Sequence, residues 1–157
     1  MRRIFWLLLM VPLLVPTQLK AQERSAQLEF LDMWVGSWEY TSVEGTTECD
    51  KVGQYVVNCR SVWTTASGDP RDAVFIIRFD PETEMLMGYR FYNSGYADSG
   101  FGWVDGNTSV FVYELPGGDR ARITQTWSGD TITYVWHSSV EGGPWEQTSE
   151  GSTKRVG

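Results

Sequence analysis

The sequence contains a single histidine, His137, and this limits the catalytic and metal chemistry that the chain can carry. A serine or cysteine hydrolase needs a histidine base beside its nucleophile, and the chain has no G-x-S-x-G elbow. Zinc sites draw on clusters of His and Cys, so one histidine argues against zinc. One axial histidine suffices for a haem. We therefore expect no metal and no cofactor, with haem bound through His137 as the alternative to a plain surface histidine.

The carboxylates lie mostly among turn residues, for example Asp80 and Asp105, and no pair has a spacing that forces two of them together. A glycosidase needs two converging carboxylates, which distant parts of a fold can still supply. An isomerase or hydrolase therefore stays an alternative, although the sequence favours a protein that is not an enzyme.

Aromatic residues make up 14% of the chain, which is high for a small domain. Such rings stabilise a core, but an apolar lining with a few polar anchors is also typical of ligand pockets. Arg78 and Arg90 interrupt apolar segments, so either both point outward or one lies inside and meets the anionic head group of a ligand. The candidate ligand-binding residues are Trp63, Phe75, Met87, Tyr89, Arg90, Phe91, Trp103, Tyr113 and Trp136.

The first 21 residues have the layout of a secretory signal peptide. Arg2 and Arg3 give a positive start, residues 4–15 are apolar, and Ala21 fits a cleavage site. The apolar run is too short for a membrane span, which needs about 20 residues. We expect cleavage after Ala21, a periplasmic or extracellular location, and a single domain over residues 22–157.

Cleavage would remove three of the thirteen basic residues and no acid, so the formal net charge would fall from −7 to about −10. Nucleic acid and anionic membrane surfaces repel such a charge. We therefore expect no nucleic-acid binding and no stable membrane insertion, and a small hydrophobic molecule as the partner.

Cys49 and Cys59 both lie in the exported part of the chain. An even number of cysteines in an oxidising compartment favours a disulfide over two reduced, buried thiols. If the segments on either side of Gly53 pair as strands, the two cysteines face each other. Closing a loop of this length contributes about 2–3 kcal/mol in the chain-entropy model.

From Gly36 onward the apolar residues recur with period two, as in half-buried strands. Turn residues separate the segments, and short connections make neighbouring strands antiparallel. Only residues 23–34 have helical spacing. A closed barrel hides its sheet edges most completely, whereas a two-sheet sandwich would show the same periodicity. The pattern predicts about eight to ten strands, near residues 37–44, 47–52, 54–64, 72–79, 84–92, 99–104, 108–115, 119–127, 131–138 and 145–155.

Gly36-Ser37-Trp38, after a short helix and at the start of the first strand, resembles the opening of lipocalin-like (calycin) barrels. FDPETEMLMGYRFYNSG and GFGWVDGNTSVFVYE resemble a group of secreted bacterial proteins of unknown function with that fold. The resemblance spans about residues 28–156 and implies an all-β, antiparallel lipocalin-like β-barrel with a short N-terminal helix. It also implies that Trp38 packs across a closed end of the barrel, near Lys154 or Arg155.

Two other barrel families share parts of this pattern. Nitrobindin-like barrels are similar in having Gly-x-Trp and a late-strand histidine, which adds to the haem alternative. Avidin-like barrels also begin with Gly-x-Trp, but the helix and the Asp80-Pro81 hairpin depart from their pattern.

In a closed barrel, one face of each strand points inward. Across the hairpin at Asp80-Pro81, we expect residues whose numbers sum to about 163–165 to pair, which places Phe75 near Tyr89. Ile77 should likewise lie near Met87. The sequence thus predicts an exported protein that binds a small hydrophobic or aromatic molecule in a barrel interior. The alternatives are a filled barrel with a structural or interaction role, and an enzyme on the same scaffold.

Overall fold

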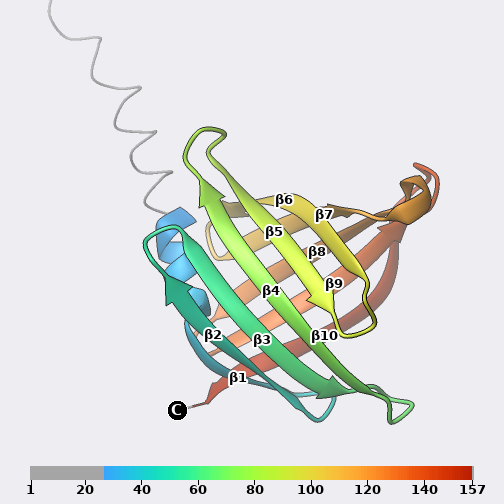
Figure 1. The fold of residues 1–157 in the computed structure, drawn as a ribbon, viewed down its shortest axis with the longest axis horizontal. Helices are drawn as coiled ribbons and strands as arrows, with labels where there is room; N and C mark the ends of the chain where they lie inside the picture. The colour runs from blue at the N-terminus through green and yellow to red at the C-terminus, as the bar shows by residue number, and fades with distance from the viewer. Residues whose placement is uncertain (1–26, 157) are drawn as a thin grey trace, which may run out of the picture.

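The computed structural model describes residues 27–156, which form a closed antiparallel barrel preceded by one short helix (Figure 1). The helix covers residues 27–34. The expected all-β barrel with a short helix before it is therefore confirmed. The expected signal peptide, residues 1–21, lies outside the described residues.

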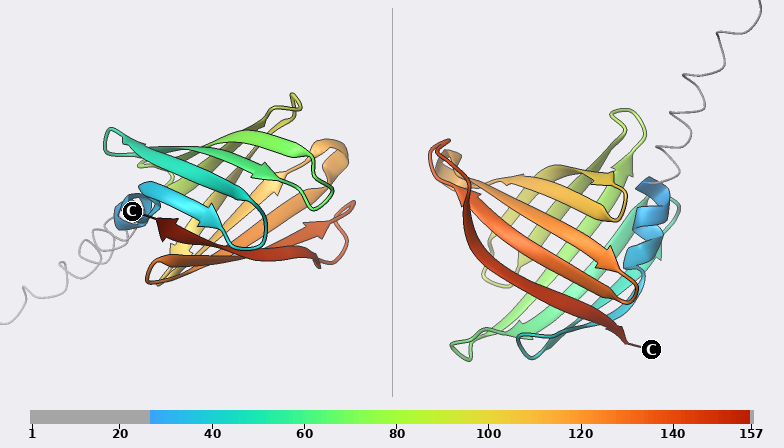
Figure 2. Two further views of the ribbon diagram at one scale, coloured as in Figure 1. Left: turned by 90° about the horizontal axis from the view of Figure 1, so that it is seen from below. Right: turned by 180° about the vertical axis from the view of Figure 1, so that it is seen from behind.

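The strands follow one another around the barrel, each pairing with its neighbour in sequence, and β10 pairs with β1 (Figure 2). Because closure leaves no unpaired sheet edge, it decides between the barrel and the sandwich. A short 3₁₀ turn at Pro116–Gly118 joins β7 to β8. The strands are β1 (Gly36–Tyr40), β2 (Gly45–Val52), β3 (Val56–Thr64), β4 (Pro70–Asp80), β5 (Met85–Tyr92), β6 (Ala97–Asp105), β7 (Thr108–Glu114), β8 (Arg120–Ser128), β9 (Thr131–Ser139) and β10 (Glu146–Val156).

The helix lies at one end of the barrel and contacts strands that are far apart in sequence (Figure 1). Phe30 is 2% exposed, and its ring lies 4.9 Å from the ring of Trp127 on β8, edge to face. Asp32 forms an ion pair with Lys51 on β2. These contacts anchor the helix over that end of the barrel.

Cys49 of β2 and Cys59 of β3 are paired across the two strands and form the expected disulfide. Their Cα atoms are 4.0 Å apart, and both side chains are buried. The bridge is therefore part of the barrel wall, with its sulfur atoms on the inner face.

Replacing Cys49 and Cys59 together with alanine is expected to lower the free energy of unfolding by about 2–3 kcal/mol, because the unfolded chain regains loop entropy. Urea denaturation followed by circular dichroism measures this change. The far-ultraviolet spectrum of the folded variant should match that of the native protein. An unchanged midpoint and slope would contradict the prediction.

The pairing of β4 with β5 joins residues whose numbers sum to 165, at the edge of the expected range, and differs by one residue from the named pairs. Phe75 pairs with Arg90, not with Tyr89, and Ile77 pairs with Gly88. A shift of one residue exchanges the two faces of a strand. The residues of β5 that face the interior are therefore Leu86, Gly88, Arg90 and Tyr92.

Large rings on β7 explain why glycines occupy the inner face of β5 and β6. A Cβ on Gly88 would lie 2.8 Å from the hydroxyl oxygen of Tyr113, and one on Gly102 would lie 2.7 Å from the ring of Phe111. Both distances are too short for a side chain. The glycines leave the space that these two rings fill.

Candidate ligand-binding cavity

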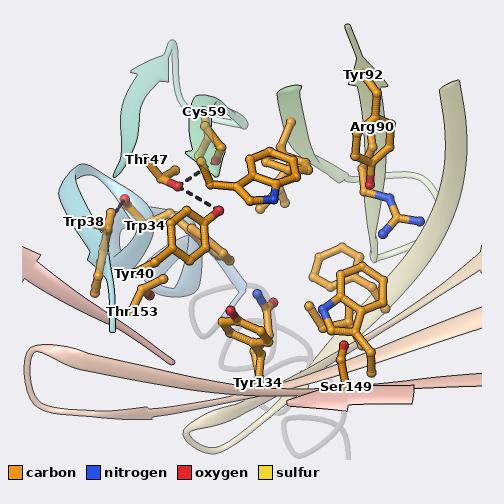
Figure 3. Close-up of a pocket in the computed structure, with 18 of the residues that line it drawn as sticks. Trp34, Trp38, Tyr40, Thr47, Cys59, Arg90, Tyr92, Tyr134, Ser149 and Thr153 are labelled. Carbon is orange, nitrogen blue, oxygen red and sulfur yellow. Dashed lines mark hydrogen bonds between the residues drawn. The ribbon is translucent and has the colours of Figure 1, made fainter. Parts of the chain in front are cut away.

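The barrel encloses a cavity of about 470 Å³, lined mainly by aromatic and aliphatic side chains. Figure 3 shows Trp34 and Trp38 on one side of it and Arg90 with Tyr92 on the other. The interior is therefore open and large enough to hold a small molecule.

Six of the nine candidate ligand-binding residues border this cavity: Trp63, Phe75, Tyr89, Arg90, Tyr113 and Trp136. The other three were also expected inside, but the register places Met87, Phe91 and Trp103 on the outer face. Tyr89 shares the outer face of β5 with Met87 and Phe91, although it borders the cavity. Phe91 is 47% exposed and Trp103 is 42% exposed. Both faces of β5 are apolar enough to be buried, so hydrophobicity alone selects the wrong one.

A group of hydroxyls forms one polar part of the wall. Thr47 and Ser61 are hydrogen-bonded through their side-chain oxygens at 2.6 Å, and the Thr47 hydroxyl donates to the Tyr40 hydroxyl at 3.3 Å (Figure 3). Thr47 and Ser61 are both buried. Because these hydroxyls bond one another, this part of the wall is polar without being charged.

Arg90 is the positively charged residue among the described residues that line the cavity, and its partner is Asp98 on β6. The guanidinium donates from Nε to Oδ1 at 2.6 Å and from Nη2 to Oδ2 at 2.5 Å. The two side chains are 5% and 1% exposed. This two-bond geometry is the strongest form of an arginine–carboxylate pair, and it neutralises the charge inside the barrel.

Aromatic rings enclose the same guanidinium. Its carbon lies 3.6 Å from the centroid of the Tyr113 ring and 4.8 Å from that of Trp136. Burial acts to lower the pKa of Arg90, but the bonds to Asp98 and the nearby tyrosines outweigh it and raise the pKa. Burial also raises the pKa of Tyr113 well above its ordinary value. At neutral pH, Arg90 is thus charged and Tyr113 is protonated.

Gln125 adds an amide to the polar groups of the lining. It is 7% exposed, and its Oε1 accepts a hydrogen bond from Ser109 at 3.2 Å. The Gln125 amide nitrogen forms no hydrogen bond within the described part of the chain. It is also not fully buried, so part of its surface is accessible. It is therefore a free donor that borders the cavity.

Trp38 and Arg155 lie beside each other where β1 meets β10. Trp38 is 1% exposed, and the Arg155 guanidinium carbon lies 4.4 Å from its ring centroid. Arg155 also donates to the carbonyl oxygens of Val35 at 2.5 Å and Met33 at 2.6 Å, which ties β10 to the end of the helix. Gly36 is suited to this junction, because its φ is +125° and a Cβ there would lie 2.8 Å from Nη1 of Arg155.

His137 lies on β9 in alternation with the cavity-lining Tyr134 and Trp136, beside Arg122 and Gln147 on the adjacent strands. It does not line the cavity, and its Nδ1 is buried with no hydrogen-bond partner among residues 27–156. The residues present therefore do not suit a haem held by His137 inside the barrel. Within residues 27–156, no group of three His, Cys, Asp or Glu side chains could hold a metal ion.

Asp98, Gln125 and the hydroxyl group around Thr47 were not predicted from the sequence. The sequence nevertheless contained a signal that shows which face of β5 and β6 points inward. Gly88, Gly100 and Gly102 share one face, and glycines on alternate positions indicate a face pressed against another backbone or a ring. Asp98 lies on that same face, so this pattern would have paired Arg90 with it.

The fold and the cavity define a closed, ten-stranded antiparallel barrel whose apolar interior holds a buried arginine.

Neither a family model nor a curated protein matches the chain. Fifteen chains of solved structures are similar to it. One is Rv2717c from M. tuberculosis, with a TM-score of 0.60, 15% sequence identity and coverage of 83% of this chain and 97% of that one. At this identity the likeness shows the fold alone.

Proposed function

We propose that this protein is exported and binds a small, flat, largely apolar molecule inside its lipocalin-like barrel. The cavity of about 470 Å³ carries the proposal, since pockets for small molecules typically measure about 300–1,000 Å³. A barrel filled by side chains, the structural alternative, would not leave this space.

Two observations support export. The disulfide between Cys49 and Cys59 is compatible with an oxidising compartment, where such bonds persist. The N-terminal segment has the layout of a signal peptide. No helix within residues 27–156 is long and apolar enough to cross a membrane.

An enzyme on this scaffold would need reacting groups inside the cavity. Glu150 is the one carboxylate among the described residues that line it, and a pair of converging acids is the arrangement that hydrolysis of a glycoside requires. The guanidinium of Arg90 is already held by Asp98. This arrangement favours binding over catalysis.

We expect N-phenyl-1-naphthylamine, a neutral fluorescent probe, to bind in the cavity and to gain fluorescence there. Trp136→Ala should weaken its affinity about tenfold, because an aromatic contact of about 0.5–1.5 kcal/mol is lost together with buried area. Titration of each protein with the probe gives the dissociation constants.

Trp103→Ala is the matched control, because it removes a tryptophan from the same barrel at a position that lies outside the cavity and is 42% exposed. Its affinity for the probe should stay within about twofold of the native value. Equal losses in the two variants, or binding that survives Trp136→Ala unchanged, would argue against the barrel interior as the binding site.

A further inference from the structure

The charge on Arg90 is balanced before any ligand enters. Two of its three guanidinium nitrogens, Nε and Nη2, donate to the two oxygens of Asp98 at 2.6 and 2.5 Å. With side chains only 5% and 1% exposed, the pair is a buried, neutral unit and not a free cation.

The third nitrogen, Nη1, has no hydrogen-bond partner within residues 27–156. Nη1 is not fully buried, so part of its surface is accessible. Arg90 lines the cavity between the rings of Tyr113 and Trp136. Because Arg90 lines the cavity, Nη1 is the guanidinium nitrogen left to donate a hydrogen bond to a molecule bound there.

The surroundings disfavour an anion at this donor. An anionic group that accepted from Nη1 would share with Asp98 a guanidinium whose charge is already balanced, and Glu150 places a carboxylate in the cavity lining. A buried charge without its own counterion is strongly unfavourable. A neutral acceptor keeps the hydrogen bond to a charged donor and avoids both the repulsion and the desolvation.

We propose that the ligand is a neutral carbonyl compound with a flat apolar body, and that its carbonyl oxygen accepts a hydrogen bond from Nη1 of Arg90. The inference rests on the proposed function, since it names the chemical class of molecule that the same cavity takes. It also replaces the anionic head group that the sequence suggested for an inward-facing arginine.

Three probes with the same naphthalene ring test this class. Displacement of N-phenyl-1-naphthylamine at pH 7.5 is measured with naphthalene, with 2-acetonaphthone, which adds a neutral carbonyl, and with 2-naphthoate, which adds a carboxylate. We expect 2-acetonaphthone to bind about tenfold more tightly than naphthalene, as one hydrogen bond to a charged donor provides. It should also bind at least about tenfold more tightly than 2-naphthoate.

Binding of 2-naphthoate as tight as that of 2-acetonaphthone would overturn the inference while leaving the proposed function intact. Equal binding of naphthalene and 2-acetonaphthone would also overturn it. If neither the fluorescent probe nor naphthalene binds, the proposed function itself fails. The comparison uses the native protein throughout, so it needs no variant that has to fold.

The double variant Arg90→Leu/Asp98→Leu tests whether the preference for 2-acetonaphthone over naphthalene depends on this pair. It removes the donor without leaving a buried carboxylate. In this variant 2-acetonaphthone and naphthalene should bind within about twofold of each other. Gln125→Leu removes another free donor of the wall and should keep the tenfold preference. If Gln125→Leu abolishes the preference and the double variant keeps it, the carbonyl does not bind at Arg90.

Discussion

Trp38→Ala is expected to lower the free energy of unfolding by about 3–5 kcal/mol, the range for large aromatic side chains in a core. The side chain is 1% exposed, and its Nε1 donates to the carbonyl oxygen of Trp34 at 2.9 Å. Its loss would leave a hole between the helix and the first strand and would uncover the Arg155 guanidinium. Denaturation in urea, followed by circular dichroism, measures the change.

Trp103→Ala is again the control, because it also removes a tryptophan from the barrel but at a position that is 42% exposed. Surface substitutions of this kind change stability by about 0.5 kcal/mol or less. A loss below about 1 kcal/mol in Trp38→Ala would contradict the closing role of this side chain.

Arg90→Leu is expected to be equally damaging, at about 3–5 kcal/mol, because it leaves the Asp98 carboxylate buried without a counterion. The substitution removes both hydrogen bonds to Asp98 and the guanidinium between Tyr113 and Trp136. The double variant Arg90→Leu/Asp98→Leu should recover much of the loss, since replacing a buried ion pair with apolar residues is often neutral. Thermal and urea unfolding of Arg90→Leu, of Asp98→Leu and of the double variant give the coupling energy between the two side chains.

The exposed ion pair of Arg60 and Asp72 provides the matched control. Its nitrogen and oxygen are 2.8 Å apart, but the side chains are 69% and 36% exposed. Solvent screens such a pair, so Arg60→Leu should leave stability nearly unchanged. A double variant of Arg90 and Asp98 that is no more stable than Arg90→Leu alone would show that the two side chains are not coupled.

The sequence by itself determined the secondary structure and which neighbouring strands pair. Alternation and short turns predicted about eight to ten strands, with bounds close to those observed, because period-two patterns and turn residues act within a few neighbouring positions. The hairpin that contains Gly53 brings Cys49 opposite Cys59 for the same local reason. The short helix was also predictable, since its helical spacing is the only one in the chain.

Only the tertiary structure decided between sheet closure and a sandwich, and between the two faces of β5. Closure depends on Trp38 pairing with Arg155, residues at opposite ends of the chain. On β5, Met87 and Phe91 make the outer face as apolar as the inner one, so hydrophobicity could not choose between them. The choice came from contacts that join different strands: Arg90 meets Asp98, and Gly88 leaves space for Tyr113. A buried ion pair and the fit of a ring over a glycine are interactions between strands, and a pattern along one strand does not encode them.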